Sequence, residues 1–444
     1  MSENRRYIKD LASHIGAEVT IKGYVDVRRD HGKLIFIDLR DATGKIQMVA
    51  LPNHAEVHTL ATTMRPEWVI EVTGKVNARP PKMVKAGDPN GAIEIEMTAA
   101  TVLAKAQELP FEKNAEINLD TYLDYLPLTL RSDRARAIFK VQAVIIKSFR
   151  DFLTGEGFTE FQSPKLIGED AEGGANSFDV EYFGHTAHLG QSPQLYKQIM
   201  VGIFERVFAT GNVYRAEKHS TTRHLNEYTS LDFEMGFIKD HTDVMAMETR
   251  MLIYVMAQLR EKCATEFAFM KADIPEVPAE IPAMKLREAQ QVIKAEHGID
   301  CSQEPDLEPQ HERWLCEYAK KKWNSDFIFI THFPISLRPF YTKEDPTDVG
   351  YALGGDLLFR GLEITTLAQR INDYDTLVAS MKKHNLDPEK FRYYLQAFKY
   401  GIAPHGGLGF GLERFTAKLL GLANVKEATL FPRDINRIDN LLSQ

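Results

Sequence analysis

Five segments between Glu18 and Ala104 alternate apolar and polar residues, as half-buried β-strands do. A helix-like stretch, HAEVHTLATTM, separates the third segment from the fourth, and Asp41 to Gly44 has the residues of a hairpin turn. Five strands with this helix placement are the arrangement of the OB fold, a small β-barrel whose face commonly binds single-stranded nucleic acid. A generic small β-barrel is the alternative. The segments are EVTIKGYVDVRR, LIFIDLRD, KIQMVAL, WVIEVTGKVN and IEIEMTAATVLA.

The chain of 444 residues is too long for one ordinary domain and has room for two or three. Its segment 108–132 is rich in Pro, Asp and Leu without clear periodicity, which favours a hinge. Apolar residues at helical spacing predict an amphipathic helix over residues 134–153, and strands and helices follow in mixed order. We therefore expect an OB-fold domain over residues 1–107, a hinge over 108–133 and an α+β domain over 134–444.

Charge and cysteine usage narrow the class of protein. The net charge of −8 argues against a chain whose whole surface grips nucleic acid, but it allows a basic face on one domain. The three cysteines are widely spaced and form no CxxC pair, so neither a disulfide framework nor a zinc site is expected. The N-terminal residues lack an apolar signal core, and no run of ~18 apolar residues occurs. We expect a cytoplasmic protein that does not span a membrane.

The stretch 214–237, YRAEKHSTTRHLNEYTSLDFEMGF, carries two charged clusters joined by a basic, hydroxyl-rich loop that can fold over phosphates. If residues 213–217 and 227–236 are paired strands, alternation places polar side chains on one face and apolar side chains on the other. A solvated hairpin with surface ion pairs is an equally good interpretation of this stretch alone. The polar face would carry Tyr228, Ser230, Asp232 and Glu234.

A glycine-rich run, PHGGLGFGLER, ends in Glu413 and Arg414 and precedes a helical pattern. Alternating glycines permit close backbone approach, and a helix that begins just after them directs its positive end and Arg414 toward an anion. The run is not the dinucleotide fingerprint, because no acidic ribose partner follows it, and it is not a P-loop, because GK[ST] is missing. On its own, such a run is weak evidence for a phosphate site.

Two further clusters carry charge. Asp356 and Glu363 are carboxylates that would hold Mg²⁺ beside a triphosphate, although an ordinary ion pair between Asp356 and Arg370 is the alternative. The segment QSPQLYK follows a glycine-rich acidic loop around Glu172 that could close as a lid. Considered alone, Lys197 in that segment would be expected on a helix surface.

Taken together, these segments resemble the class II aminoacyl-tRNA synthetases, and specifically the aspartyl-tRNA synthetases of the compact archaeal and eukaryotic type. GFTEFQSPKL, YRAEKHSTTRHLNEYTSLDFEM and GLGFGLERF resemble the three class motifs in order, and QSPQLYK is specific to the subclass. The resemblance covers nearly the whole chain. It implies an antiparallel sheet flanked by helices that binds bent ATP, a homodimer with Pro164 at its interface, and formation of aspartyl-adenylate before transfer to tRNA.

The resemblance also assigns residues to ATP. Arg215 would bind the α-phosphate and stabilise the charge that develops there, Arg414 would grip the γ-phosphate, and these two would be the catalytic residues. Mg²⁺ is the implied cofactor, with Asp356 and Glu363 as its ligands. The other ATP contacts would come from Glu217, Arg223, His224, Tyr228, Glu363 and Gly411, with Tyr228 under the base where the family usually has Phe.

Aspartate is assigned to a different set of residues. Lys197 and Arg370 would clamp its side-chain carboxylate, and a neutral amide would leave these desolvated cations without a negative charge. Asparaginyl-tRNA synthetases share the motifs but typically lack the lysine, so aspartate activation by a Lys197→Ala variant would contradict the assignment. The remaining contacts would come from Glu172, Gln194, Asp232 and Thr366, although Thr365 to Ala368 stands where the family has Ser-Ser-Gly-Gly.

In the barrel, GYVDVRRDHGKLIFIDLRD and KIQMV resemble the family's anticodon-binding domain, with Arg29, Phe36 and Gln47 at the reading positions. The implied partner is tRNA(Asp). Asp26 matches neither residue that distinguishes relatives specific for tRNA(Asp) from those that also charge tRNA(Asn), so that choice stays open. An asparaginyl enzyme and a catalytically silent RNA-binding relative are the alternatives; Lys197 disfavours the first, and the retained arginines and carboxylates disfavour the second.

Overall fold

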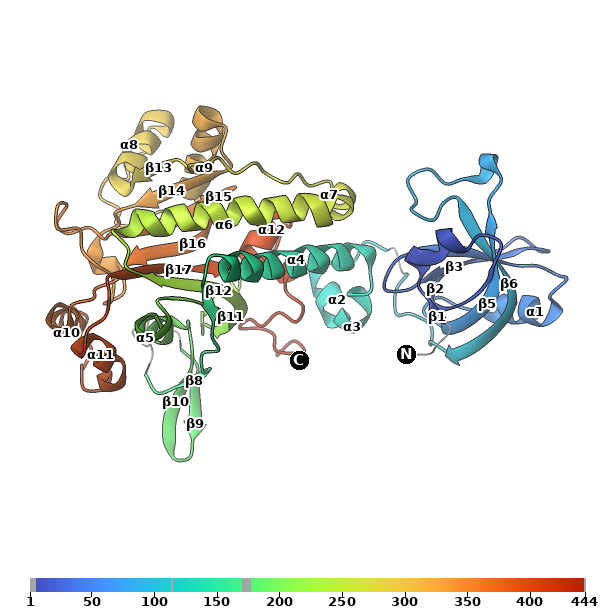
Figure 1. Cartoon of the computed structure of the whole chain (residues 1–444), viewed down its shortest axis with the longest axis horizontal. Coiled ribbons are helices and arrows are strands. Elements are labelled where there is room, and N and C mark those ends of the chain that lie inside the picture. Colours follow the sequence, from blue (N-terminus) through green and yellow to red (C-terminus); the bar gives the residue numbers. More distant parts are fainter. Residues whose placement is uncertain (1–4, 113–114, 170–176, 443–444) are drawn as a thin grey trace. The chain divides into compact units, whose positions relative to one another are not determined.

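The structure is a computed structural model that describes residues 5–112, 115–169 and 177–442 (Figure 1). The chain divides into two compact units, Met1–Glu116 and Ile117–Gln444. This division lies inside the segment predicted as a hinge. The second half of that segment forms two short helices of the second unit, α2 (Leu119–Asp124) and α3 (Leu126–Thr129).

The first unit is the predicted OB-fold barrel. The five barrel strands, β2 to β6, bury apolar side chains in one core, and β2 pairs with both β3 and β5, so the sheet closes on itself in the order β2-β3-β4-β6-β5. The helix α1 (Ala55–Thr63) lies between the third and fourth barrel strands, as expected. The elements are β1 (Arg5–Arg6), β2 (Glu18–Asp30), β3 (Ile35–Arg40), β4 (Lys45–Ala50), β5 (Val69–Ala78) and β6 (Ile93–Ala104), with 3₁₀ turns at Ile8–His14 and Pro81–Met83.

The second unit is built on an eight-stranded sheet with the order β13-β14-β15-β16-β17-β12-β11-β7. Its six central strands, from β14 to β11, are antiparallel, and only the two edge pairings are parallel. The strands are β7 (Thr159–Glu160), β11 (Arg206–Tyr214), β12 (Glu227–Gly236), β13 (Ala283–Lys285), β14 (Phe327–Thr331), β15 (Gly354–Phe359), β16 (Leu362–Gln369) and β17 (His405–Gly411).

Two long helices, α4 (Asp133–Gly155) and α6 (His241–Lys262), run side by side and bury the apolar face of this sheet (Figure 1). The first begins at Ser132, whose hydroxyl accepts the Ala135 N–H and so satisfies a free donor of the first turn. It covers the helix predicted over residues 134–153. The other helices are α5 (Gln194–Phe204), α7 (Ala264–Met270), α8 (Leu286–His297), α9 (Pro309–Trp323), α10 (Tyr374–Lys383), α11 (Arg392–Lys399) and α12 (Leu412–Leu419), with 3₁₀ turns at Ile335–Leu337 and Val425–Ala428.

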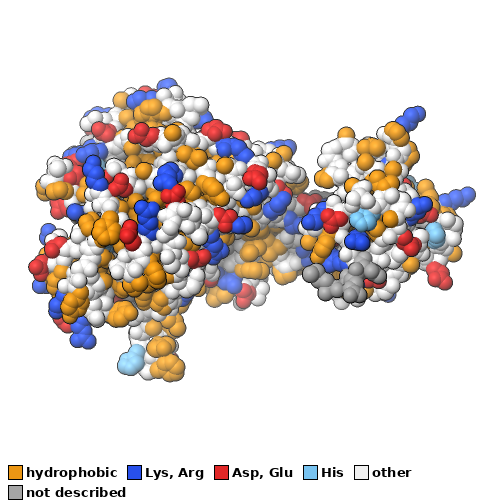
Figure 2. Space-filling model, in the orientation of Figure 1, with side chains coloured by type: hydrophobic (Ala, Val, Ile, Leu, Met, Phe, Trp, Pro, Cys, Tyr) orange, Lys and Arg blue, Asp and Glu red, His pale blue; other side chains and the backbone are white. Residues whose placement is uncertain are grey.

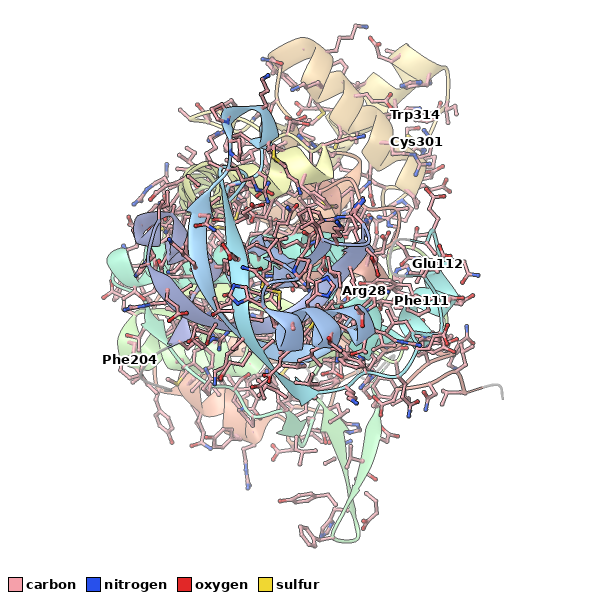
Figure 3. All side chains as sticks on the ribbon, turned by 90° about the vertical axis from the view of Figure 1, so that its right-hand side faces the viewer. Arg28, Phe111, Glu112, Phe204, Cys301 and Trp314 are labelled. Carbon is pink, nitrogen blue, oxygen red and sulfur yellow. The ribbon has the colours of Figure 1, made fainter. Side chains whose placement is uncertain are left out.

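A small sheet of β8 (Leu166–Ile167), β9 (Asp179–Tyr182) and β10 (His185–Leu189) projects from the second unit, and hydrophobic side chains gather at its tip (Figure 2). Helices α8 and α9 carry their own apolar core, in which Cys301 is buried and against which Trp314 packs (Figure 3). All three cysteines are buried free thiols. Among the helices of the described residues, none is long and apolar enough to cross a membrane.

Candidate active site

A cavity of about 270 Å³ opens on the polar face of the central sheet. Its walls come from α5, β12, β16 and β17, from the loop after β11, and from residues 337–342, which precede β15. These elements bring QSPQLYK (191–197) and the stretch 214–237 together with the glycine-rich run (404–414), which is distant from both in the sequence. Its lining includes the charged side chains of Lys197, Arg215, Arg223, Asp232, Glu363, Arg370 and Arg414, so it is suited to a charged ligand.

The strand that carries most of these side chains is β12, and the predicted alternation along it is confirmed. Leu231, Phe233 and Met235 lie in the apolar core, whereas Tyr228, Ser230 and Asp232 line the cavity. The predicted partner strand over residues 213–217 was misplaced, because β11 covers Arg206–Tyr214 and pairs with β12 as far as Glu227. Arg215 and Glu217 therefore lie beyond the strand, on the loop that borders the cavity.

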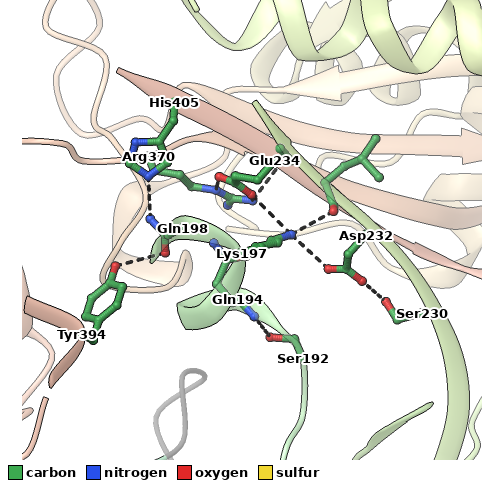
Figure 4. Close-up of polar contacts among 12 residues, drawn as sticks. Ser192, Gln194, Lys197, Gln198, Ser230, Asp232, Glu234, Arg370, Tyr394 and His405 are labelled. Atoms are coloured by element: carbon green, nitrogen blue, oxygen red, sulfur yellow. Dashed lines mark hydrogen bonds and ion pairs between the residues drawn. The ribbon is translucent and has the colours of Figure 1, made fainter. Parts of the chain in front are cut away.

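Four buried charges, of which Lys197, Asp232 and Arg370 line the cavity and Glu234 lies beneath them, form the floor of the cavity (Figure 4). The Lys197 ammonium donates to Asp232 Oδ2 at 3.0 Å and to the Leu408 carbonyl at 2.9 Å, and lies 3.4 Å from Glu234 Oε2. Arg370 donates to both carboxylate oxygens of Glu234, at 2.9 and 3.3 Å. These residues are at most 5% exposed, so Lys197 is not the surface residue that its helix alone would suggest. The net charge of these two cations and two anions is zero.

The charge balance also determines protonation. Burial alone would raise the pKa of Glu234, but the adjacent Arg370 and Lys197 charges outweigh it and hold the pKa below its ordinary value. Glu234 therefore stays ionised near neutral pH and holds the two cations in place. An anionic ligand group that reaches this floor would meet cations whose positions are already fixed.

The glycine-rich run forms β17, which lies between β12 and β16. A Cβ atom on Gly407 would lie 2.1 Å from the Phe233 carbonyl oxygen and 2.4 Å from Glu234 Oε2. A Cβ on Gly409 would lie at an ordinary 3.4 Å from Asp232 Oδ2. Gly407 is thus required for the close approach of this strand to the buried carboxylate. The predicted helix α12 follows, and its Arg414 and Glu413 line the cavity.

The two carboxylates expected to hold a metal lie on neighbouring strands, Asp356 on β15 and Glu363 on β16. Asp356 is paired with Arg338, at 2.9 and 3.2 Å, and not with Arg370 as the alternative interpretation proposed. Burial raises the pKa of Asp356 to about 6, and the nearby Glu363 charge adds to the increase. Two interacting carboxylates supply the oxygen ligands that a hard divalent cation prefers, and a bound cation would relieve their mutual repulsion.

Three basic side chains, from the loop after β11 and from α12, have acidic partners. Arg223 forms a bidentate pair with Glu312 of α9, at 2.7 and 3.0 Å, and its carbonyl accepts from Arg414 Nε at 3.3 Å. The Arg414 Nη1 atom lies 3.6 Å from Glu363. His224 lies 3.4 Å from Glu217, and burial lowers the pKa of its imidazole.

The residues expected beside the adenine also line the cavity. The Arg215 guanidinium lies 5.7 Å from the centre of the Tyr228 ring. Glu413 accepts the Thr229 N–H through both oxygens, at 3.0 and 3.1 Å, and burial raises its pKa to about 7. Gly411 borders the same region. The carboxyl of Glu413 can accept a hydrogen bond from an amino group of a ligand.

The remaining residues predicted for the site lie as follows. Gln194 and Thr366 line the cavity, and the Thr366 hydroxyl donates to Glu363 at 2.8 Å. Pro164 is exposed between β7 and β8. Glu172 lies outside the described residues. Sequence analysis missed Arg338 and Glu312, which pair with Asp356 and Arg223, because each lies on an element that only the tertiary fold brings to the site.

The predicted residues of the barrel are also brought together. On adjacent strands, Arg29 lies opposite Phe36, and Asp38 lies opposite Gln47. Arg29 forms a bidentate pair with Asp38 at 2.8 Å and lies 3.5 Å from Gln47. Phe36 is half-buried. A ring flanked by polar groups whose positions are fixed is a suitable surface for unpaired bases.

Comparisons with known proteins agree with this geometry. Residues 118–435 match the family of tRNA synthetases class II (D, K and N), and residues 19–103 match the OB-fold nucleic acid binding domain. Relatives include the aspartate–tRNA(Asp/Asn) ligases of Deinococcus radiodurans, 45% identical over 98% of both chains, and of Thermus thermophilus, 44% identical over 98% of this chain and 99% of the relative. The asparaginyl-tRNA synthetase of Pyrococcus horikoshii with asparaginyl-adenylate superposes with a TM-score of 0.91, at 31% identity over 99% of this chain and 100% of that chain.

Proposed function

Since the chain belongs to the class II tRNA synthetases of the D, K and N group, we propose that it is an aspartate–tRNA ligase. It activates L-aspartate with ATP to aspartyl-adenylate and transfers the aspartyl group to the 3′ end of tRNA(Asp). The observation that carries this choice is the buried pair of cations, Lys197 and Arg370, on the cavity floor. The solved asparaginyl enzyme shares the fold, so the fold alone does not select the amino acid.

Binding of aspartate requires an exchange of partners at Lys197, whose ammonium is already surrounded by two carboxylates and a carbonyl. We infer that the side-chain carboxylate of the substrate replaces Asp232 at this ammonium. Asp232 then accepts from the substrate's α-ammonium, with Gln194 and Thr366 at the sides. Asparagine would present a neutral amide to the same cations and leave their charge uncompensated, which is a large penalty in a buried site.

Activation proceeds by attack of an α-carboxylate oxygen of aspartate on the α-phosphorus of ATP. The new P–O bond forms as the bond to pyrophosphate breaks. Arg215 stabilises the developing charge on the α-phosphate, and Arg414, Arg223 and His224 bind the outer phosphates. Tyr228 stacks on the adenine, and Glu217 and Gly411 border it. When bound by Asp356 and Glu363, Mg²⁺ neutralises phosphate charge.

Transfer completes the reaction. A hydroxyl of the terminal ribose of tRNA attacks the aspartyl carbonyl, and AMP leaves. Arg29, Phe36 and Gln47 read the anticodon on the barrel, far along the chain from the reacting atoms. Exposed Pro164 belongs to the interface of a homodimer, and the buried free cysteines are consistent with a reducing cytoplasm.

Pyrophosphate exchange tests the amino acid. Incubation with labelled pyrophosphate, ATP, Mg²⁺ and one amino acid at a time should give label in ATP with aspartate alone. Exchange with asparagine alone would identify an asparaginyl enzyme. Lack of exchange with either amino acid by folded protein would identify a relative that only binds RNA.

The range of tRNA requires a separate measurement. The relatives from Deinococcus and Thermus are named for both tRNA(Asp) and tRNA(Asn), and in this chain Asp26 is buried in ion pairs with Lys45 and Arg40, at 2.9 and 3.4 Å. We propose that both tRNAs are charged. Two transcripts that differ only in the third anticodon base should then be aspartylated at similar rates. A preference above about a hundredfold, which corresponds to ~2.7 kcal/mol, would exclude the relaxed activity.

A further inference from the structure

A second layer of polar residues lies directly behind the cations of the cavity floor (Figure 4). It consists of Gln198 on α5, Tyr394 on α11 and His405 at the start of β17. The Tyr394 hydroxyl donates to Gln198 Oε1 at 3.0 Å, Gln198 Nε2 lies 3.0 Å from His405 Nε2, and His405 Nδ1 lies 2.8 Å from the Ala403 carbonyl oxygen. None of the three side chains lines the cavity, and all are buried.

With His405 as a neutral imidazole, each hydrogen bond among these three side chains has a defined direction. A carbonyl oxygen only accepts, so His405 Nδ1 carries the hydrogen that faces Ala403. The amide of Gln198 must then donate to the bare Nε2, and its oxygen must accept from Tyr394. All three side chains are satisfied in one arrangement, in which His405 is a neutral imidazole. Burial acts in the same direction, since it lowers the pKa of His405.

The three hydrogen-bonded side chains are linked to both floor cations through the backbone. Gln198 follows Lys197 on α5, so it fixes the helix turn from which the ammonium projects. The backbone carbonyl of His405 accepts the Arg370 N–H at 2.8 Å, so it fixes the point from which the guanidinium projects. The next residue but one, Gly407, is held against Glu234 too closely for any side chain. A shift of β17 at His405 would therefore be transmitted to the floor.

Charge gives the second reason for a neutral histidine. Lys197, Arg370, Asp232 and Glu234 sum to zero charge in a site that is almost completely buried. An imidazolium directly behind them would add an unbalanced cation, and a missing Gln198 contact would leave the imidazole free to turn. Both changes would alter the field that a substrate carboxylate meets.

We propose that the hydrogen-bonded chain Tyr394–Gln198–His405 is a positioning element that holds Lys197 and Arg370 in register for a carboxylate side chain, and so contributes to selection of the acid over its amide. This inference rests on the proposed function, because it assumes that the floor binds the side chain of aspartate. The three residues do not touch the substrate. Their effect is expected in aspartate recognition and not in ATP binding or in the chemical step.

The test is steady-state pyrophosphate exchange by full-length Tyr394→Phe, which removes one hydroxyl and leaves Gln198 Oε1 without its donor. Loss of one such hydrogen bond corresponds to a rise of about threefold to tenfold in KM for aspartate. The KM for ATP and the kcat should stay within about twofold. The matched control is Tyr393→Phe, the same change at the next position of α11, where the side chain is 74% exposed.

A pair of variants at His405 separates positioning from general damage. His405→Leu removes the acceptor for Gln198 and should raise the aspartate KM, whereas His405→Gln keeps an acceptor near the Nε2 position and should restore most of it. The ratio of kcat/KM for aspartate over asparagine should fall in His405→Leu and recover in His405→Gln. If His405→Leu does not fold, the Tyr394 pair still decides.

An unchanged aspartate KM in Tyr394→Phe would overturn the inference, as would equal changes in the kinetic constants for ATP and aspartate. Both results are distinct from failure of the proposed function itself. If the proposed function were wrong, the wild-type protein itself would show no aspartate-dependent exchange, and no variant would need to be compared.

Discussion

Replacement of Lys197 by methionine removes one buried charge while keeping nearly the same side-chain length. The ammonium has three partners within 3.4 Å, and its residue is 1% exposed. Without it, Glu234 keeps its pair with Arg370, Asp232 loses its ion pair with Lys197, and the floor changes from neutral to one net negative charge. Breaking a buried ion pair by removal of one partner costs about 3–5 kcal/mol. A negative floor also repels the carboxylate that it should bind.

If this cost falls on the complex with aspartate, kcat/KM for aspartate should drop by about two to four orders of magnitude. The assay is aspartate-dependent pyrophosphate exchange at saturating ATP and Mg²⁺, with the KM for ATP expected within about threefold of wild type. Lys239→Met, at an exposed lysine just after β12, is the matched control.

Loss of folding must be distinguished from loss of recognition. The double variant Lys197→Met with Asp232→Asn returns the floor to zero net charge, so it should recover thermal stability without recovering aspartate activation. Retention of aspartate exchange within about threefold of wild type in folded Lys197→Met would refute the assignment of this lysine to the substrate carboxylate.

Three other perturbations test separate parts of the account. Asp356→Asn should raise the Mg²⁺ concentration for half-maximal exchange by at least about tenfold. In wild type this concentration should rise as the pH falls through about 6, where the Asp356 carboxylate takes up a proton. A half-maximal Mg²⁺ concentration that stays constant between pH 5.5 and 8 would contradict the role of Asp356. Gly407→Ala places a Cβ 2.4 Å from Glu234 Oε2 and should lower the melting temperature and abolish exchange, whereas Gly409→Ala should be tolerated; equal effects of the two would argue against the close approach. Phe36→Ala should raise the KM for tRNA in aminoacylation roughly tenfold and leave exchange unchanged, so a defect in exchange would place Phe36 in the fold and not in recognition.

The strands of the barrel and of β12 could be predicted because each has one buried and one polar face, which imposes a period of two on the sequence. The beginning of β11 could not be predicted in this way. Val207 and Phe208 are adjacent and both buried, so this part of the strand lacks alternation. The helices α2 and α3 were missed for a related reason, since six and four residues are too few to show helical periodicity.

The site residues divide in the same way. Motif residues such as Arg215 and Arg414 could be chosen because charged groups cluster locally beside glycines and a helix start. The ion pairs of the site could not be predicted, because Arg223 and Glu312 are 89 positions apart and Lys197 and Asp232 are 35 apart. Burial of Lys197 is a property of the assembled sheet, and no local pattern in α5 predicts it.

The most direct test of the central claim is a competition in which the protein chooses its own product. A tRNA(Asp) transcript is incubated with the protein, ATP, Mg²⁺ and equal concentrations of aspartate and asparagine, and the aminoacyl-adenosine released by ribonuclease is identified by mass spectrometry. Aspartyl-adenosine alone is predicted. Asparaginyl-adenosine, or a mixture of the two in comparable amounts, would contradict the account of the buried cation floor.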